Sequence, residues 1–275
     1  NVNVNVNVNV NVNVNIIYLC FLSLFMYIVS SLYFYKNKDI HPNTYHHLHI
    51  YEVESNKMLE LIGINKIFIV RNFTDEFSYI TPKYLRQHYG NQMINAHTTI
   101  CEQYSKNTVQ ITLSNFFEHF KEEVLYIKED LDFMYKTNLR KRVDMKMRNY
   151  FTNLFLRYYL IWIGSKGTKS GIHKDMDEQN YLLQVYGKKK VILFQSDDDT
   201  IFKVRKEKEG TASLSSIDYW KDNIDIPKKE VILHAGDILS IPSGWWHCAE
   251  NLSESIAISC RAESWLNMLS YLYNN

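Results

Sequence analysis

Two histidines and an aspartate set the strongest constraint on how this chain folds. His173 and Asp175 stand one residue apart in SGIHKDMDEQNYLLQVYGKK, and His247 ends the stretch GDILSIPSGWWH. Two imidazoles and one carboxylate are the ligand set that fills one face of an octahedral Fe(II) and leaves three positions open. Because 72 residues separate Asp175 from His247, we expect the fold to bring opposite ends of a domain together.

Their spacing distinguishes these residues from neighbouring candidates. In an extended segment side chains alternate between two faces, so His173 and Asp175 project to the same side. Asp177 and Glu178 are rival carboxylates, but neither forms the His-x-carboxylate spacing with His173. We therefore predict that His173, Asp175 and His247 bind a metal, and that Asp177 and Glu178 are solvated turn residues.

Short apolar runs dominate the chain from residue 158 onward. No helical pattern is interleaved between them, and glycines at positions 187 and 236 mark tight turns. This pattern predicts a mainly β, double-stranded β-helix (a jelly roll) with flanking helices. The predicted strands are 158–164, 180–187, 190–195, 230–236, 237–242 and 255–260.

Before residue 158 the sequence predicts a mixture of strands and helices. The run KIFIVRNF at 66–73 is typical of a strand. Thr81 as N-cap and Pro82 at the first helical position predict the start of a short helix. Ser114 begins a second predicted helix, in which apolar residues as far as Ile127 fall on one face.

The N-terminal region differs from the rest in composition. Residues 1–15 alternate Asn and Val, a low-complexity tract that we expect to form no packed structure. Residues 16–35 contain no charge, glycine or proline, and a helix of that length spans ~30 Å, the thickness of a bilayer core. They predict a transmembrane or signal-anchor helix that attaches the chain to a membrane. Residues 36–57 would follow as a linker and 58–275 as the jelly-roll domain.

The overall composition leaves other properties open. A buried helix of the fold or a cleaved signal peptide also fits residues 16–35, and a soluble cytoplasmic or nuclear location is the alternative. The formal net charge of +1 favours neither nucleic acid nor acidic partners, so RNA is not excluded. Four cysteines without CxxC spacing are expected to be free thiols.

The residues around the predicted metal site resemble a known family. The segment SGIHKDMDEQNYLLQVYGKKKVILF, followed by AGDILSIPSGWWH, is similar to the JmjC/cupin-like 2-oxoglutarate oxygenases, above all to the small JmjC hydroxylases. The resemblance covers roughly residues 60–260 and is dense in 158–260. It implies a jelly roll that uses Fe(II), 2-oxoglutarate and O2, with His173, Asp175 and His247 as the catalytic iron ligands.

The resemblance also implies where 2-oxoglutarate binds. Lys189 matches the lysine that pairs with the C5 carboxylate of the cosubstrate, and it shares a strand face with Val191 and Leu193. A lysine among inward apolar residues must pair with a buried charge or move out. The other matching cosubstrate-binding positions are Ser170, Asn180, Tyr126 and Ser259.

Three departures from the family pattern stand near the predicted site. The gap from His173 to Asn180 is one residue longer than usual. Gly171 replaces a common proline, and the last strand ends in Cys260-Arg261 where an aromatic residue is common. These departures bear on the identity of the substrate more than on iron binding.

The resemblance implies a dioxygenase that hydroxylates a protein side chain. A tRNA or RNA hydroxylase and a histone demethylase are alternatives within the same family. A non-catalytic metal-binding jelly roll that serves as an interaction module is an alternative of another class, although Lys189 and Ser170 beside the triad argue against it. A protein substrate is the expected partner, RNA is the second candidate, and a homodimer stays open.

Overall fold

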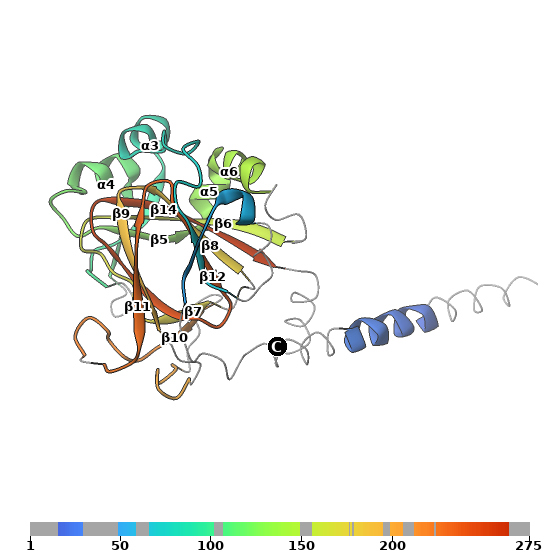
Figure 1. Ribbon diagram of the computed structural model, residues 1–275. Helices are drawn as coiled ribbons and strands as arrows, with labels where there is room; N and C mark the ends of the chain where they lie inside the picture. The colour runs from blue at the N-terminus through green and yellow to red at the C-terminus, as the bar shows by residue number, and fades with distance from the viewer. Residues whose placement is uncertain are drawn as a thin grey trace, which may run out of the picture. The chain divides into compact units, whose positions relative to one another are not determined.

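A computed structural model gives the structure of this protein (Figure 1). By their contacts the residues fall into two compact units, Asn1–Pro42 with Ser264–Asn275, and Asn43–Glu263. The residues that the structure describes are 16–29, 49–58, 66–101, 107–148, 156–175, 177, 179–194, 199–205, 212–222 and 224–263.

Strands make up most of the regular structure in the unit Asn43–Glu263. The strands are β1 (Tyr51–Val53), β2 (Phe68–Val70), β3 (Met93–His97), β4 (Thr108–Thr112), β5 (Tyr126–Asp130), β6 (Leu156–Gly164), β7 (His173–Asp175), β8 (Gln179–Tyr186), β9 (Lys188–Phe194), β10 (Ala212–Leu214), β11 (Lys228–His234), β12 (Ile238–Pro242), β13 (Trp246–Asn251) and β14 (Ser255–Glu263). The helices are a 3-10 helix at Ser55–Lys57, α3 (Pro82–Tyr89), α4 (Leu113–His119), α5 (Leu131–Lys136) and α6 (Leu139–Met147).

The strands form two sheets. The first has the order β1-β2-β12-β8-β14-β6-β5-β3-β4, and the second has the order β10-β7-β13-β9-β11. Neighbouring strands within them run antiparallel, apart from the parallel pair β1 and β2. Helices α3 to α6 lie together on one side of the strands (Figure 1). This arrangement confirms the prediction of a mainly β, jelly-roll architecture with flanking helices.

Alternating burial shows which strand face lies between the two sheets. In β9, Val191 and Leu193 join an apolar cluster that also contains Ala257 of β14, in the other sheet. Ile192 and Phe194 join a different cluster. Because successive side chains of a strand point to opposite faces, the first cluster fills the space between the sheets. We call that side the interior face.

Most of the C-terminal strand predictions are confirmed, whereas one helix prediction is wrong. Strands β6, β8, β9, β11, β12 and β14 coincide with the six predicted runs to within a few residues. The helix predicted from Ser114 through Ile127 ends instead at His119, and Ile127 lies in β5. Tyr126 is buried in the interior cluster and Ile127 in the cluster beneath the helices. Burial of adjacent residues on opposite sides suits a strand and not a one-faced helix.

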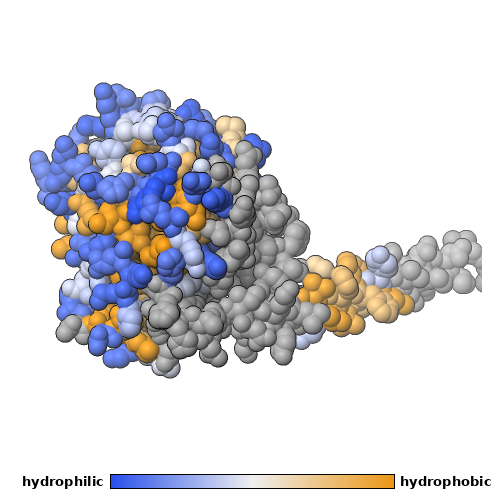
Figure 2. Space-filling model, viewed as in Figure 1, coloured by the Kyte–Doolittle hydropathy of each residue, from blue (hydrophilic) through white to orange (hydrophobic). Residues whose placement is uncertain are grey.

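The prediction of a membrane-spanning helix over residues 16–35 is wrong. The membrane attachment that was inferred from this helix is therefore wrong as well. The described helix covers 16–29, which at 1.5 Å per residue is ~21 Å long, short of the ~30 Å of a bilayer core. Among the described residues, no helix is both long and apolar enough to cross a membrane. The visible surface of the helix at 16–29 is nevertheless apolar (Figure 2). The Asn-Val tract at 1–15 and residues 30–48 lie outside the described residues.

The N-cap of α3 provides a test of the local structure. Thr81 accepts a hydrogen bond through its hydroxyl from the backbone N–H of Tyr84, at 3.2 Å. Thr81→Ala should lower the free energy of unfolding by ~1 kcal/mol, because the first turn loses that partner. Lys83→Ala, at an exposed position of the same helix, should change it by less than ~0.5 kcal/mol. Equal effects in chemical denaturation would contradict the capping role.

Candidate metal centre

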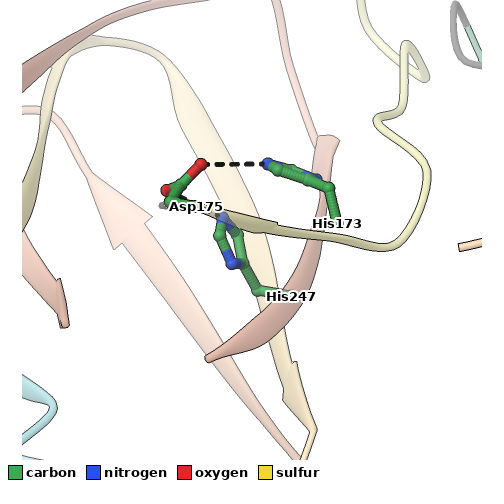
Figure 3. Close-up of side chains that lie close together, drawn as sticks. All are labelled: His173, Asp175 and His247. Atoms are coloured by element: carbon green, nitrogen blue, oxygen red, sulfur yellow. Dashed lines mark ion pairs between the residues drawn. The ribbon is translucent and has the colours of Figure 1, made fainter. Parts of the chain in front are cut away.

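Three side chains meet on the interior face where β7 and β13 lie side by side. His173 and His247 are directly paired across these antiparallel strands, and their ring centroids are 4.2 Å apart. Asp175 follows two residues after His173 in β7, so both side chains emerge on the same face. Figure 3 shows the three side chains gathered around a common point. The convergence predicted from the sequence spacing is confirmed.

The distances between donor atoms suit one shared ion. His173 Nε2 lies 4.0 Å from Asp175 Oδ1, and His247 Nε2 lies 3.6 Å from Asp175 Oδ2. Two ligands that each bind a first-row metal ion at ~2.1 Å can stand no more than ~4.2 Å apart, and both distances fall within that limit. Within the described part of the chain, this is the one group of three such side chains that could hold a metal ion.

Backbone carbonyls fix the orientation of both imidazoles. Nδ1 of His173 lies 2.9 Å from the carbonyl oxygen of Gly171, and Nδ1 of His247 lies 2.9 Å from that of Trp245. A carbonyl oxygen only accepts hydrogen bonds, so each Nδ1 must be the donor. The Nε2 lone pairs are then directed at the common point, which is the arrangement found in metal-binding histidines.

Burial and charge set all three groups in their metal-binding protonation states. Burial lowers the pKa of His247 to about 4, with a further contribution from the neighbouring His173. Burial also lowers the pKa of His173. Burial alone would raise the pKa of Asp175, but Arg261 and the two imidazoles hold it below its ordinary value. At neutral pH the site therefore has two neutral imidazoles and one carboxylate, as metal binding requires.

The surroundings of Asp175 fit a divalent ion. Asn180 Nδ2 donates to Oδ2 at 2.8 Å, and Arg261 Nη1 stands 2.8 Å from Oδ1. Arg261 Nη1 donates its hydrogen bond to Asp177. Among the described residues, Oδ1 of Asp175 therefore accepts no well-aligned hydrogen bond. A buried carboxylate oxygen without such a donor, beside two imidazole nitrogens, matches the donor set of non-haem Fe(II).

Lys189 lies on the interior face of β9. Its exposed fraction is 4%, whereas Lys188 is exposed and Lys190 is half-buried. This burial pattern agrees with the alternation predicted from the sequence. His247 of β13 is paired with Leu193, which is four residues, or ~13 Å of strand, from Lys189. The pairing of Lys189 with 2-oxoglutarate stays a prediction.

The other predicted cosubstrate residues are also buried. The Ser170 hydroxyl accepts a hydrogen bond from the backbone N–H of Ala249, and the Ser259 hydroxyl accepts one from Trp162 Nε1, both at 2.9 Å. Tyr126 belongs to the interior cluster, with its ring 6.2 Å from that of Trp162. Asn180, described above, contacts the ligand Asp175 directly. Their contacts with 2-oxoglutarate stay predictions.

Sequence reasoning missed two buried charged residues at the site. Asp177 was expected to be solvated, but its exposed fraction is 3% and its carboxylate accepts a hydrogen bond from Arg261 at 2.8 Å. That expectation is wrong because the Asp177 carboxylate is buried against Arg261 and the Tyr158 hydroxyl. The signals were present in the sequence as the longer gap before Asn180 and the unusual Arg261. The strand β13 that carries His247 was also missed.

The sequence model of the cupin-like domain family matches residues 61–267. Among curated proteins, the arginine-specific demethylase JMJ22 of Arabidopsis thaliana is 33% identical over 42% of this chain and 25% of its own length. The lysine-specific demethylase JMJ30 of the same plant is 33% identical over 36% of this chain and 24% of its own length.

A third relative matches a longer stretch. The tRNA wybutosine-synthesizing protein 5 of Gallus gallus is 26% identical over 61% of this chain and 60% of its own length. The chain thus spans about a quarter of the length of the two demethylases and less than two thirds of the third relative.

Removing one ligand tests the metal centre. Wild-type protein should bind Mn(II), a redox-stable stand-in for Fe(II), and His247→Ala should abolish that binding because two ligands do not complete the site. His234→Ala, on an exposed position of β11, should leave it unchanged. Isothermal titration calorimetry measures both. Equal Mn(II) affinity in wild type and His247→Ala would place the metal elsewhere.

Proposed function

The chain belongs to the cupin-like domain family, and on this premise we propose that it is a JmjC-type oxygenase that uses Fe(II) and 2-oxoglutarate to hydroxylate a protein side chain. The observation that carries the proposal is the convergence of His173, Asp175 and His247 on one point of the interior face. Curated relatives of this chain bear the names of an arginine-specific demethylase, a lysine-specific demethylase and a JmjC domain-containing protein, which supports the assignment to this enzyme class.

The three ligands leave room for chemistry at the metal. Fe(II) bound with 2-oxoglutarate and O2 supplies an oxidative hydroxylation in which the cosubstrate leaves as succinate and CO2. His173, Asp175 and His247 would occupy one face of the ion and keep the opposite face open. The two Nδ1 hydrogen bonds to backbone carbonyls hold the imidazoles in place, so no ligand needs to rearrange when the ion binds.

Lys189 would select the cosubstrate. The family resemblance assigns this role to it, and its buried ammonium on the interior face would form an ion pair with the distal carboxylate of 2-oxoglutarate. The same space would be lined by four other buried residues, which are Tyr126 of β5, Ser170 before β7, Asn180 of β8 and Ser259 of β14. A dicarboxylate held at both the metal and Lys189 would be oriented before O2 arrives.

Substrate class separates the remaining candidates. A net charge of +1 gives no general attraction for a polyanion, which favours a protein over RNA. The similarity to a tRNA wybutosine-synthesizing protein supports RNA as the second candidate. The names of the demethylase relatives support a methylated arginine or lysine side chain as an alternative protein target.

Turnover of 2-oxoglutarate tests the enzyme assignment. With Fe(II) and ascorbate, the protein should release succinate, and a pool of peptides should stimulate release more than a pool of RNA. The matched control is Asp175→Ala, which lacks one ligand and should be inactive. Stimulation by RNA alone would replace the protein substrate with RNA. Absence of succinate in every condition would favour the non-catalytic module.

Replacing Lys189 tests the cosubstrate site separately. Lys189→Ala should weaken 2-oxoglutarate binding by ~3–5 kcal/mol, because the buried carboxylate of the cosubstrate loses its partner. Mn(II) affinity should not change, since Lys189 is not a ligand. Lys188→Ala removes a neighbouring charge at an exposed position and is the control. Calorimetric titration of 2-oxoglutarate into the Mn(II)-loaded protein gives the 2-oxoglutarate affinity of each variant. Unchanged 2-oxoglutarate binding in Lys189→Ala would rule out Lys189 as the cosubstrate-binding residue.

A further inference from the structure

Two departures from the family pattern meet in one contact beside the metal centre. The segment after Asp175 is one residue longer than usual and contains Asp177, and Arg261 stands on the last strand where an aromatic residue is common. These positions are 84 residues apart, yet Arg261 Nη1 donates to Asp177 Oδ2 at 2.8 Å. Asp177 of the longer segment and the unusual arginine are therefore partners.

The same guanidinium also contacts a metal ligand. Arg261 Nη1 lies 2.8 Å from Asp175 Oδ1, and Nη2 lies 3.6 Å from Glu129 Oε1. The exposed fraction of the Arg261 side chain is 2%, so solvent does little to weaken these contacts. Arg261 is thus a buried cation that joins Asp175 to two carboxylates outside the metal triad.

Strand register explains how Arg261 reaches this place. It is paired with Tyr158 of β6 on one side and with Asn180 of β8 on the other. Paired residues of adjacent strands project to the same face of a sheet, so all three lie in one row on the interior face. Asn180 contacts Asp175, and the Tyr158 hydroxyl donates to Asp177. The row thus supports the ligand carboxylate through two routes.

The backbone of β5 is irregular next to the same group. The pairing of β5 with β6 shifts register between Ile127 and Asp130. Within that irregularity Glu129 has a φ of 47°, which is uncommon for a residue other than glycine. Bulges of this kind redirect side chains and are frequent near active sites. Here the redirected carboxylate is the one that approaches Arg261.

We propose that Arg261, anchored by Asp177 and Tyr158, is a positioning residue that holds Asp175 in the orientation that binds the metal. This inference rests on the metal centre of the proposed function. Asn180 donates a hydrogen bond to Oδ2 of Asp175, and the Arg261 guanidinium attracts Oδ1 as an ion pair at 2.8 Å, so rotation of the carboxylate is restrained from both sides. Donors that orient a metal ligand in this way typically contribute about 10–100-fold to metal affinity.

Charge and orientation predict opposite results when Arg261 is removed. A guanidinium close to a divalent cation repels it, so Arg261→Gln should strengthen metal binding if charge alone matters. If Arg261 positions Asp175, the same substitution should weaken Mn(II) binding by about 10–100-fold. Arg261→Lys keeps the charge but not the forked geometry that reaches two carboxylates at once, and should restore only part of the affinity.

Tyr158→Phe tests the positioning role without changing any charge. It removes the hydroxyl that donates to Asp177 and should weaken Mn(II) binding in the same direction as Arg261→Gln, by a smaller factor. In the Arg261→Gln background the tyrosine substitution should have no further effect, because it acts through Arg261. Because Arg261→Gln leaves three carboxylates without their cation, it endangers folding, and Tyr158→Phe then decides the question.

The experiment titrates the full chain with Mn(II) and measures the remaining free ion by its EPR signal. Circular dichroism checks that each variant is folded. Arg71→Gln is the control, because it breaks another pairing of an arginine with a buried aspartate, Asp237, at 2.7 Å. It should leave Mn(II) affinity unchanged. Weaker binding in Arg261→Gln and Tyr158→Phe, but not in Arg71→Gln, supports the inference.

Two other results have distinct meanings. Wild-type affinity in Tyr158→Phe, with wild-type or tighter binding in a folded Arg261→Gln, overturns the positioning role and leaves the proposed function intact. If the wild-type protein binds no Mn(II), the metal centre itself is refuted, and the inference about Arg261 is refuted with it.

Discussion

The direct pairing of His173 with His247 across β7 and β13 is the contact on which the site depends. It brings two ligands from distant parts of the chain onto the interior face, and Asp175 joins them through the alternation of β7. A shift of one residue in β13 would turn His247 outward and bring Trp246 inward, because the side-chain period of a strand is two. Trp246 and Cys248 are packed in the outer apolar cluster. The apolar core therefore fixes the register that the metal centre requires.

Placing a carboxylate and two imidazoles in an apolar interior has an electrostatic cost that neighbouring residues offset. An ionised carboxylate loses its hydration on burial, and it stays charged only with compensating donors or cations. Asn180 and Arg261 meet that requirement for Asp175. The two histidines stay neutral and satisfy Nδ1 through backbone carbonyls. The site is thus prepared for a cation by groups that lie in both sheets.

The sequence predicted those features that depend on residues close together in the chain, and it missed features that depend on distant residues. The strands of the C-terminal half and the inward face of Lys189 follow from local alternation of apolar residues, and the triad follows from a specific spacing. The prediction of a helix through Ile127 was wrong because the same apolar positions fit both a helical and a strand period. Only the pairing of β5 with β6 decides between the two. The burial of Asp177 was missed because its partner Arg261 is 84 residues away, and the two sequence signals were not connected with each other. The membrane prediction rested on composition and length alone, whereas no helix among the described residues is long and apolar enough to cross a membrane.

The two buried cations of the described interior, Lys189 and Arg261, stand on different sheets. Arg261 lies among three carboxylates of the chain itself, at 2.8, 2.8 and 3.6 Å. An incoming dicarboxylate would have to displace one of these internal partners, so Arg261 is poorly suited to select a cosubstrate. Lys189 stands on the opposite sheet, four residues along β9 from the partner of His247. On the proposed function, Arg261 of β14 would orient a metal ligand and Lys189 of β9 would recognise the cosubstrate, so substitutions of these two residues should each affect one property without the other.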